Sequence, residues 1–548
     1  MPRGVIVRGN ELSGTDNLTK GDLLIMGTLF LVALGIKFYF LQFCRVISSD
    51  GVAYAQIARD ILAGRGFAGA THFPPFYPLL VALFHTMFSD IELAGRLAAM
   101  FMGSLLVIPV YLLAREFFDR QVGIMAAVLV MAWPSLRLWS NEVMSQSTYI
   151  TLVLLGGYLI WHACKSRSVA YAVAGGLAMG MAHLTRSEGV LVFLVLSLVL
   201  AVDAGVKRDG RQFVCLLAGW CAFVVVFFPY AYFLHEVTGT WQLTGKSRVA
   251  LADSLMEYLG RPDLKRDPAF QEIGYLDVVR RYPDFLRQNI PENLMKFIRE
   301  FVPPYLWLLG LLGFCTGGWS RDKLKERAFL IATFAPMGII VVFFFIGPEY
   351  TQPYLPVFFL WVSAGALWME KRALALVGVG RHPLLTLRGA GGMFSLAATV
   401  LFALYLLVGQ VPADRNLPYH FSQDGGRYDH KRIGQLLNEY LPKSARIMTR
   451  WGRVGFYADR GWVDMPQASL EEIVATARKS GTRYIVVDGA LAGLRPQLGV
   501  LYEPLFVEGA SGVYVEKGDG FRPLPGLKLY FLYRDPSSVG VAVYEVLG

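Results

Sequence analysis

Long apolar runs separated by short polar segments dominate the first 410 residues of the chain. A helix needs about 20 apolar residues to cross the roughly 30 Å hydrocarbon core of a bilayer. About eleven runs meet or approach that length, which predicts a polytopic α-helical membrane protein. They lie at 22–44, 93–114, 122–135, 147–163, 168–183, 188–204, 212–234, 303–319, 328–346, 353–369 and 390–409. A shorter apolar run at 76–88 has prolines at or near its start, which indicates a re-entrant or interfacial helix.

The pattern changes after residue 410. Residues 430–445 have helical periodicity and lead into the strand candidate Ala445–Thr449, and residues 469–481 lead in the same way into Tyr484–Val487. Further strand candidates lie at 512–517 and 541–547. Because helix and strand periodicities alternate here, we expect residues 410–548 to form a small soluble α/β domain.

Lysine and arginine are concentrated in every second loop between the apolar runs. The opposite short loops carry only Arg45, Arg137 and Arg186. Since positive charge marks the cytoplasmic side of a membrane protein, the N-terminus is expected in the cytoplasm and the α/β domain outside, in the periplasm. The resulting division of the chain is a cytoplasmic tail at 1–21, a transmembrane domain at 22–409 with outer loops 45–92 and 235–302, and an extracytoplasmic domain at 410–548.

The composition agrees with a protein of the inner or plasma membrane. Hydrophobic residues make up 54% of the chain and charged residues only 17%. The formal charge of +10 comes mainly from the short loops, so we expect the bilayer as a partner and no nucleic acid. The five cysteines lack metal-ligand spacing, and no phosphate-cradling loop or dinucleotide fingerprint is present, which leaves a soluble nucleotide-sugar donor unsupported.

Two acidic residues are expected at the outer membrane surface. Asp50 follows the first apolar run, and Glu142 lies between the third and fourth runs. Ionisable groups at the membrane are costly, so two carboxylates facing one cavity would suit a general base, a divalent metal site, or both. The alternative is that each is a solvated loop residue or, for Asp50, part of a helix cap.

The motifs that follow Asp50 come in a specific order. They are "SSDGVAYAQIARDILAGRGF" (48–67), "HFPPFYPLLVALF" (72–84), "AGGLAMGMAHLTRSEGVLVF" (174–193) and "TGTWQLTGKSRVAL" (238–251). This series resembles class C (GT-C) glycosyltransferases, in particular the protein O-mannosyltransferases and the lipid A aminoarabinose transferases. The resemblance covers about the first 250 residues, and beyond them only the general architecture is similar.

The resemblance implies a GT-C fold and an inverting glycosyl transfer on the outer face of the membrane. The donor would be a sugar on a polyprenyl phosphate, and the acceptor a lipid, a polysaccharide or a protein of the cell envelope. Asp50 would be the general base, and Glu142 would match the second acidic position. Cations are needed at the leaving phosphate, and the candidates are Arg186, Lys246 and Arg248.

Further residues are expected around the substrate. Tyr54, His72, Arg65 and Arg96 are candidates for the walls of the cavity. Transfer by a single carboxylate base requires no cofactor. A site for Mg²⁺ or Mn²⁺ on Asp50 and Glu142 is the alternative that stays open.

Two departures from the family pattern stand out. The string "EYTQPYLPVFF" (349–359) lacks an expected arginine, and Asp50 is followed by Gly51 instead of a second acid. Two other functions stay open: a lipid or saccharide transporter or flippase without transferase activity, and a non-catalytic scaffold that binds envelope polymer.

Overall fold

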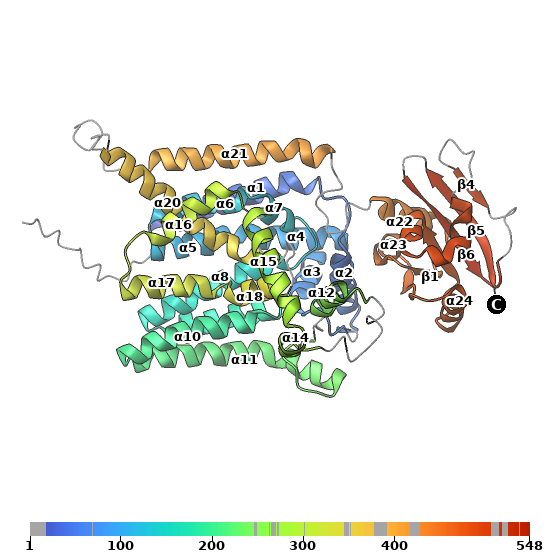
Figure 1. Ribbon diagram of the computed structural model, residues 1–548, viewed down its shortest axis with the longest axis horizontal. Coiled ribbons are helices and arrows are strands. Elements are labelled where there is room, and N and C mark those ends of the chain that lie inside the picture. The colour runs from blue at the N-terminus through green and yellow to red at the C-terminus, as the bar shows by residue number, and fades with distance from the viewer. Residues whose placement is uncertain are drawn as a thin grey trace, which may run out of the picture.

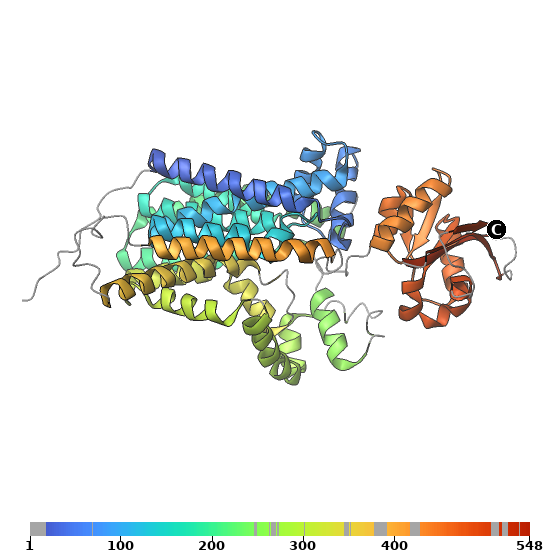
Figure 2. The same ribbon diagram turned by 90° about the horizontal axis from the view of Figure 1, so that it is seen from above.

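The protein consists of a helical bundle followed by an α/β domain at one end of the bundle (Figures 1 and 2). The computed structural model describes residues 18–67, 70–245, 249–261, 264, 270, 273–300, 302–344, 350, 352–376, 392–416, 428–505, 514–517, 524–535 and 538–547.

The first half of the bundle contains α1 (Lys20–Leu41), α2 (Ser49–Leu62), α3 (Phe76–His85), α4 (Ile91–Leu105), α5 (Val107–Phe117), α6 (Arg120–Ala132), α7 (Pro134–Trp139), α8 (Gln146–Ser166), α9 (Val169–His183), α10 (Gly189–Lys207) and α11 (Gly210–Thr238). The second half contains α12 (Val249–Leu259), α14 (Tyr275–Arg281), α15 (Pro283–Glu300), α16 (Pro304–Cys315), α17 (Arg321–Ala332), α18 (Ala335–Phe343), η2 (Gln352–Tyr354), α20 (Leu355–Leu376) and α21 (Met393–Asn416).

Each of the eleven predicted apolar runs coincides with a helix or a pair of consecutive helices. By length and composition, five helices of the described chain are suited to cross a membrane, or seven if two bent helix pairs each count as one span. Other apolar helices, such as α6 and α9, are shorter than a full crossing. The number eleven therefore stays a prediction, while the membrane character of the protein is clear. The run at 76–88 forms the short helix α3.

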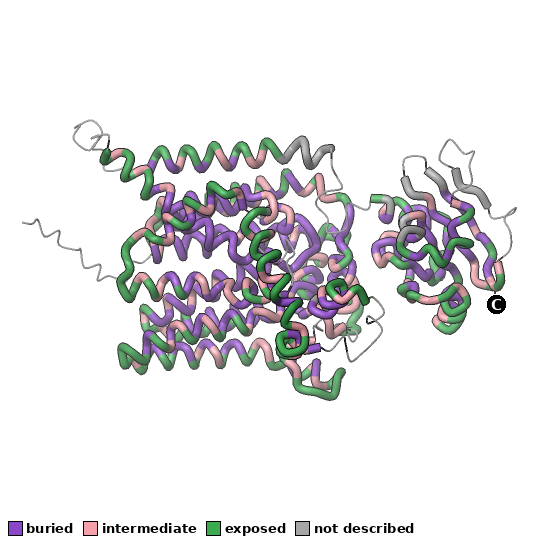
Figure 3. Tube along the Cα trace, in the orientation of Figure 1, coloured by how far each residue is buried: buried purple, intermediate pink, exposed green. Residues whose placement is uncertain are grey.

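The bundle has a tightly packed centre and an apolar outer surface. Central helices such as α4, α5 and α8 are mostly buried, whereas α1 and α11 expose much of their length (Figure 3). Their exposed side chains are large and apolar, which suits contact with lipid. Glycine permits the closest helix contacts: a Cβ on Gly176 of α9 would collide with the backbone of Gly219 on α11.

The start of α1 is anchored by charge. Thr19 and Asp22 form a capping box, and the buried Asp22 carboxylate accepts a hydrogen bond from the Tyr111 hydroxyl of α5. Arg120, at the start of α6, lies 3.0 Å from the same carboxylate. These contacts fix one end of α1, and the chain that leaves its other end carries Asp50.

The C-terminal domain is built on a six-stranded mixed sheet in the order β2-β1-β3-β6-β5-β4. Its strands are β1 (Arg446–Thr449), β2 (Gly461–Asp464), β3 (Tyr484–Asp488), β4 (Tyr514–Lys517), β5 (Leu527–Asp535) and β6 (Ser538–Val546). Its helices are α22 (Tyr428–Tyr440), α23 (Gly452–Ala458), α24 (Leu470–Lys479), α25 (Gly489–Leu494), η4 (Pro496–Leu498), α26 (Gly499–Tyr502) and η5 (Glu503–Leu505).

Strand alternation gives this sheet two buried faces. In β3, Tyr484 and Val486 pack with α22 and α23, while Ile485 and Val487 pack with α24 and the short helices after it. β1 pairs in parallel with β2 and β3, and β6 pairs antiparallel with β3. The strand candidates in the sequence correspond to β1, β3, β4 and β6, and the structure adds β2 and the long β5.

Candidate active site

Asp50 lies in the first turn of α2, not at its cap. Ser48 is the N-cap residue, and its hydroxyl accepts a hydrogen bond of 3.0 Å from the Gly51 amide. A carboxylate in the first turn is favoured by the positive end of the helix dipole. No residue in the described part of the chain forms a hydrogen bond or an ion pair with the Asp50 side chain. The carboxylate is therefore available to a ligand.

Tyr54 lies one turn after Asp50 and is held rigidly. Its hydroxyl is 2.9 Å from the Ser145 hydroxyl, and its ring meets the rings of Phe73 and Tyr77 edge-on at 4.9 and 5.0 Å. Burial, reinforced by the negative charge of Asp50, raises the pKa of Tyr54 well above its ordinary value. Tyr54 is therefore a neutral phenol at any physiological pH.

Asp50 and Tyr54 line a small polar cavity of about 40 Å³ at the end of the bundle. Four further segments complete its wall: the loop before α3, the start of α8, the loop between α9 and α10, and the chain shortly before η2. The full lining is Asp50, Tyr54, His72, Phe73, Pro74, Gln146, Thr185, Arg186, Ser187, Glu188 and Tyr350. Four predicted site residues, Asp50, Tyr54, His72 and Arg186, are thus brought together.

Arg186 provides the positive charge of this cavity. Its side chain is only 10% exposed, and its Nη2 lies 3.3 Å from Glu188 Oε1. The guanidinium also lies near the faces of the Tyr350 and Tyr149 rings, at 5.3 and 5.9 Å. Since an arginine is always protonated, the cavity combines a fixed cation with the carboxylate of Asp50.

A second, apolar cavity of about 370 Å³ shares a wall with the polar one. Tyr350 lines both of them. The other residues of the apolar cavity come from α15, α18 and the region of η2: Leu294, Phe297, Phe334, Ala335, Met337, Gly338, Ile339, Val341, Val342, Phe343, Pro353 and Tyr354. A polar chamber therefore adjoins an apolar one at Tyr350.

Glu142 does not share the cavity with Asp50. It is buried beside Arg96, whose Nη1 lies 3.9 Å from Glu142 Oε1 and whose Nη2 donates a 2.6 Å hydrogen bond to Glu92. Burial raises the pKa of Glu142 to about 7, against the lowering effect of Arg96. Two of the predicted residues, Glu142 and Arg96, thus belong with Glu92 to a buried ionic cluster. Neither of them lines the cavity.

The C-terminal domain contacts this same cluster through α22 and α23. The Tyr457 hydroxyl accepts a 2.7 Å hydrogen bond from the Ile47 amide and donates one of 3.1 Å to Glu92. Lys431 donates to the Arg45 carbonyl, and the buried Arg453 donates to the Ser49 hydroxyl. Residues 45–49, which lead into Asp50, are therefore held by the C-terminal domain.

The remaining predicted cations lie elsewhere. Arg65 is 58% exposed and forms an ion pair of 2.6 Å with Asp60 at the far end of α2, away from the cavity lining. Lys246 and Arg248 lie outside the described residues. The glycine directly before them, Gly245, packs against the backbone of Thr71, next to His72 in the cavity wall.

Sequence reasoning missed five polar residues of the cavity wall: Gln146, Thr185, Ser187, Glu188 and Tyr350. Gln146 is almost fully buried, and its side-chain oxygen has no hydrogen-bond partner among the described residues. Gln146 is the first residue of α8 and follows the same outer loop as Glu142. This position is the feature of the sequence that could have indicated a place in the cavity wall. Tyr350 lies in the very string that lacks the expected arginine.

The described residues contain no group of three or more histidine, cysteine, aspartate or glutamate side chains that could hold a metal ion. The pair considered for Mg²⁺ or Mn²⁺, Asp50 and Glu142, is divided between the cavity and the buried cluster. A divalent-ion site on these two residues has no support in their geometry.

Comparison with known proteins finds similarity to membrane glycosyltransferases. Residues 72–233 match the family of dolichyl-phosphate-mannose-protein mannosyltransferases. A curated relative, dolichyl-phosphooligosaccharide-protein glycotransferase 3 of Archaeoglobus fulgidus, is 25% identical over 192 residues, or 30% of this chain. The chain spans only 22% of the length of that relative.

Two solved structures have the same fold. ArnT from Cupriavidus metallidurans, bound to undecaprenyl phosphate, superposes with a TM-score of 0.57 at 16% identity, covering 95% of this chain and 98% of the other. An oligosaccharyltransferase of Archaeoglobus fulgidus, tethered to an acceptor peptide, gives 0.55 at 14% identity and covers 87% and 70%. Together with the match over residues 72–233, these similarities show that the chain has the GT-C fold and confirm the resemblance to GT-C glycosyltransferases seen in the sequence.

Proposed function

We propose that the protein transfers a glycosyl group from a polyprenyl-phosphate sugar to an acceptor hydroxyl at the outer face of the membrane. The observation that carries this proposal is the junction of the two cavities. Such a donor has a long apolar tail, a phosphate and a sugar. An apolar chamber that meets, at Tyr350, a polar cavity lined by Arg186 and Asp50 supports a donor of this kind. The relative bound to undecaprenyl phosphate supports a carrier of this class.

In this proposal Asp50 is the general base. Its carboxylate removes the proton of the acceptor hydroxyl while that oxygen attacks the anomeric carbon of the sugar. The bond between the anomeric carbon and the phosphate oxygen breaks, and the phosphate leaves with the bonding electrons. Attack opposite the leaving group inverts the configuration at the anomeric carbon.

Arg186 stabilises the leaving phosphate. Its guanidinium presents several N–H donors in a plane that matches phosphate oxygens, and burial strengthens the interaction because little water competes. Lys246 and Arg248 stay candidates for further phosphate contacts on the strength of the sequence motif. Tyr54, as a neutral phenol, supports the wall beside Asp50 without competing for the proton.

The test is transfer of radiolabel from a polyprenyl-phosphate sugar to envelope lipid, glycan or protein by the purified protein. Labelled acceptor and free polyprenyl phosphate in equal amounts support the proposal. Movement of the intact donor across a vesicle membrane, without release of polyprenyl phosphate, would instead identify a flippase.

A further inference from the structure

A third cavity, of about 340 Å³, lies at the opposite end of the bundle from Asp50. Asp119 lines it, and the next residue, Arg120, contacts Asp22 at the start of α1. Asp50 lies beyond the other end of this 22-residue helix, which is about 33 Å long. The two cavities are therefore separated by about one bilayer thickness.

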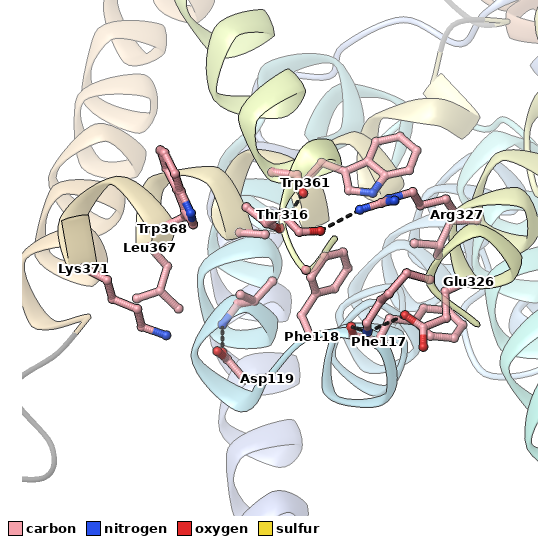
Figure 4. A pocket seen from close by; sticks show the side chains of 16 residues that line it. Phe117, Phe118, Asp119, Thr316, Glu326, Arg327, Trp361, Leu367, Trp368 and Lys371 are labelled. Atoms are coloured by element: carbon pink, nitrogen blue, oxygen red, sulfur yellow. Dashed lines mark hydrogen bonds and ion pairs between the residues drawn. The ribbon is translucent and has the colours of Figure 1, made fainter. Parts of the chain in front are cut away.

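The wall of this cavity is largely aromatic and apolar, and it also carries basic side chains. Figure 4 shows Arg327 of α17 and Lys371 of α20 on opposite sides of the space, with aromatic side chains between them. Its apolar residues include Phe117, Phe118, Val122, Leu330, Trp361, Ala364, Leu367 and Trp368. An apolar wall next to basic side chains suits an amphipathic anion.

Arg327 is a buried cation of this cavity with a hydrogen-bond donor left unused by the described residues. Only 7% of it is exposed, and no carboxylate among the described residues forms an ion pair with it. Its Nη2 donates to the Thr316 carbonyl at 2.6 Å, and its guanidinium lies 4.5 Å from the centre of the Trp319 ring. Its Nη1 has no hydrogen-bond partner in the described part of the structure. Burial of a cation with an unused donor is costly unless an anion binds there.

The other charges of the cavity leave Arg327 uncompensated. Glu326 is paired with Lys323 at 2.7 Å, and Asp119 caps α6 by accepting from the Val122 amide. Lys371 is exposed and forms no ion pair with any described residue. Arg327 and Lys371 are therefore the two cations available to a bound anion.

We propose that this cavity binds the phosphate headgroup of an anionic membrane lipid. The Arg327 fork donates to the phosphate oxygens, and Lys371 adds a second positive charge from the other side. The acyl chains lie along the aromatic wall, which a free phosphate would leave uncovered. This site is distinct from the Asp50 cavity, and its occupancy does not depend on the proposed glycosyl transfer.

The experiment measures lipid binding to the purified full chain by native mass spectrometry and by thermal stabilisation in detergent. Phosphatidylglycerol is compared with phosphatidylcholine and with glycerol 3-phosphate at equal concentration. We expect binding of phosphatidylglycerol to exceed that of both others. Equal binding of phosphatidylcholine would contradict charge recognition, and equal binding of glycerol 3-phosphate would contradict the lipid.

Three variants locate the site. Arg327→Gln is expected to weaken phosphatidylglycerol binding about tenfold, the effect of losing a charge-assisted hydrogen bond. Lys371→Gln changes an exposed residue, leaves the fold intact and is expected to weaken binding about fivefold. Arg211→Gln removes an exposed cation of the same end of the bundle and serves as the matched control. Wild-type affinity in both Arg327→Gln and Lys371→Gln would overturn the proposal.

Discussion

The buried cluster around Glu142 predicts an unusual dependence of stability on pH. Burial raises the pKa of Glu142 from 4.5 to about 7. Between these values the folded protein retains a proton that the unfolded chain releases, so the free energy of unfolding must fall as the pH rises. Above pH 7 the carboxyl is ionised in both states, and its contribution no longer changes.

The size of this effect follows from the shift. Each pKa unit corresponds to 1.36 kcal/mol, so the shift amounts to about 3 kcal/mol lost between pH 4.5 and pH 7. Glu142→Gln keeps the shape of the side chain but cannot titrate. Arg96 retains Glu92 as a partner at 2.6 Å in this variant, so the cluster still holds an ion pair.

The assay is denaturant-induced unfolding of the full chain in detergent, at several pH values from 4.5 to 8. The stability of wild type relative to Glu142→Gln should decline by about 3 kcal/mol over the interval and then level off. Glu439→Gln, at an exposed glutamate of α22, is the control and should follow wild type. If the free energy of unfolding of wild type and of Glu142→Gln changes with pH in the same way, the inference that burial raises the pKa of Glu142 is refuted.

Three other predictions concern the cavities and the C-terminal domain. Arg186→Gln should lower the rate of transfer about 10²- to 10³-fold, and Arg186→Lys should lose less because it keeps the charge; initial rates at saturating donor check this. Ile339→Asn, at a 58% exposed residue of the apolar cavity, should raise KM about tenfold for a long-chain polyprenyl donor and leave a short-chain donor unaffected. Tyr457→Phe loses the hydrogen bond that its hydroxyl accepts from the Ile47 amide and the one that it donates to Glu92, so hydrogen exchange of residues 45–49 should rise about fivefold. Tyr440→Phe, at an exposed residue, should leave this exchange unchanged.

The helices of the bundle were predictable because apolar runs of fixed length are the strongest pattern that a sequence can carry. The predicted run at 147–163 became α8, and the run at 212–234 became α11. Breaks within helices were not predictable in the same way. The run at 328–346 is divided between α17 and α18, which meet at a bend of 56°.

The cavity was predictable only where its residues lie in local motifs. Asp50 and Tyr54 lie within one motif and Arg186 within another, so the ordered motifs identified them. Gln146 and Tyr350 reach the cavity through the packing of distant helices, which a single sequence does not specify.

Glu142 illustrates the limit of reasoning from topology. Its loop emerges at the same surface as Asp50, and this suggested a common cavity. The side chain is instead buried outside the cavity, where it forms an ion pair with Arg96. The docking of Tyr457 on Glu92 had no signal in the sequence, because it joins residues that are 365 positions apart.

The measurement that tests the account most directly compares glycosyl transfer by wild type and Asp50→Asn, with a radiolabelled polyprenyl-phosphate sugar as donor. The control is Asp60→Asn, which changes an acid of the same helix that pairs with Arg65 outside the cavity. With thermal stability matched, the account predicts that Asp50→Asn loses about 10²- to 10⁴-fold in rate, while Asp60→Asn stays near wild type. Transfer by Asp50→Asn at the wild-type rate would contradict the claim that this carboxylate is the base.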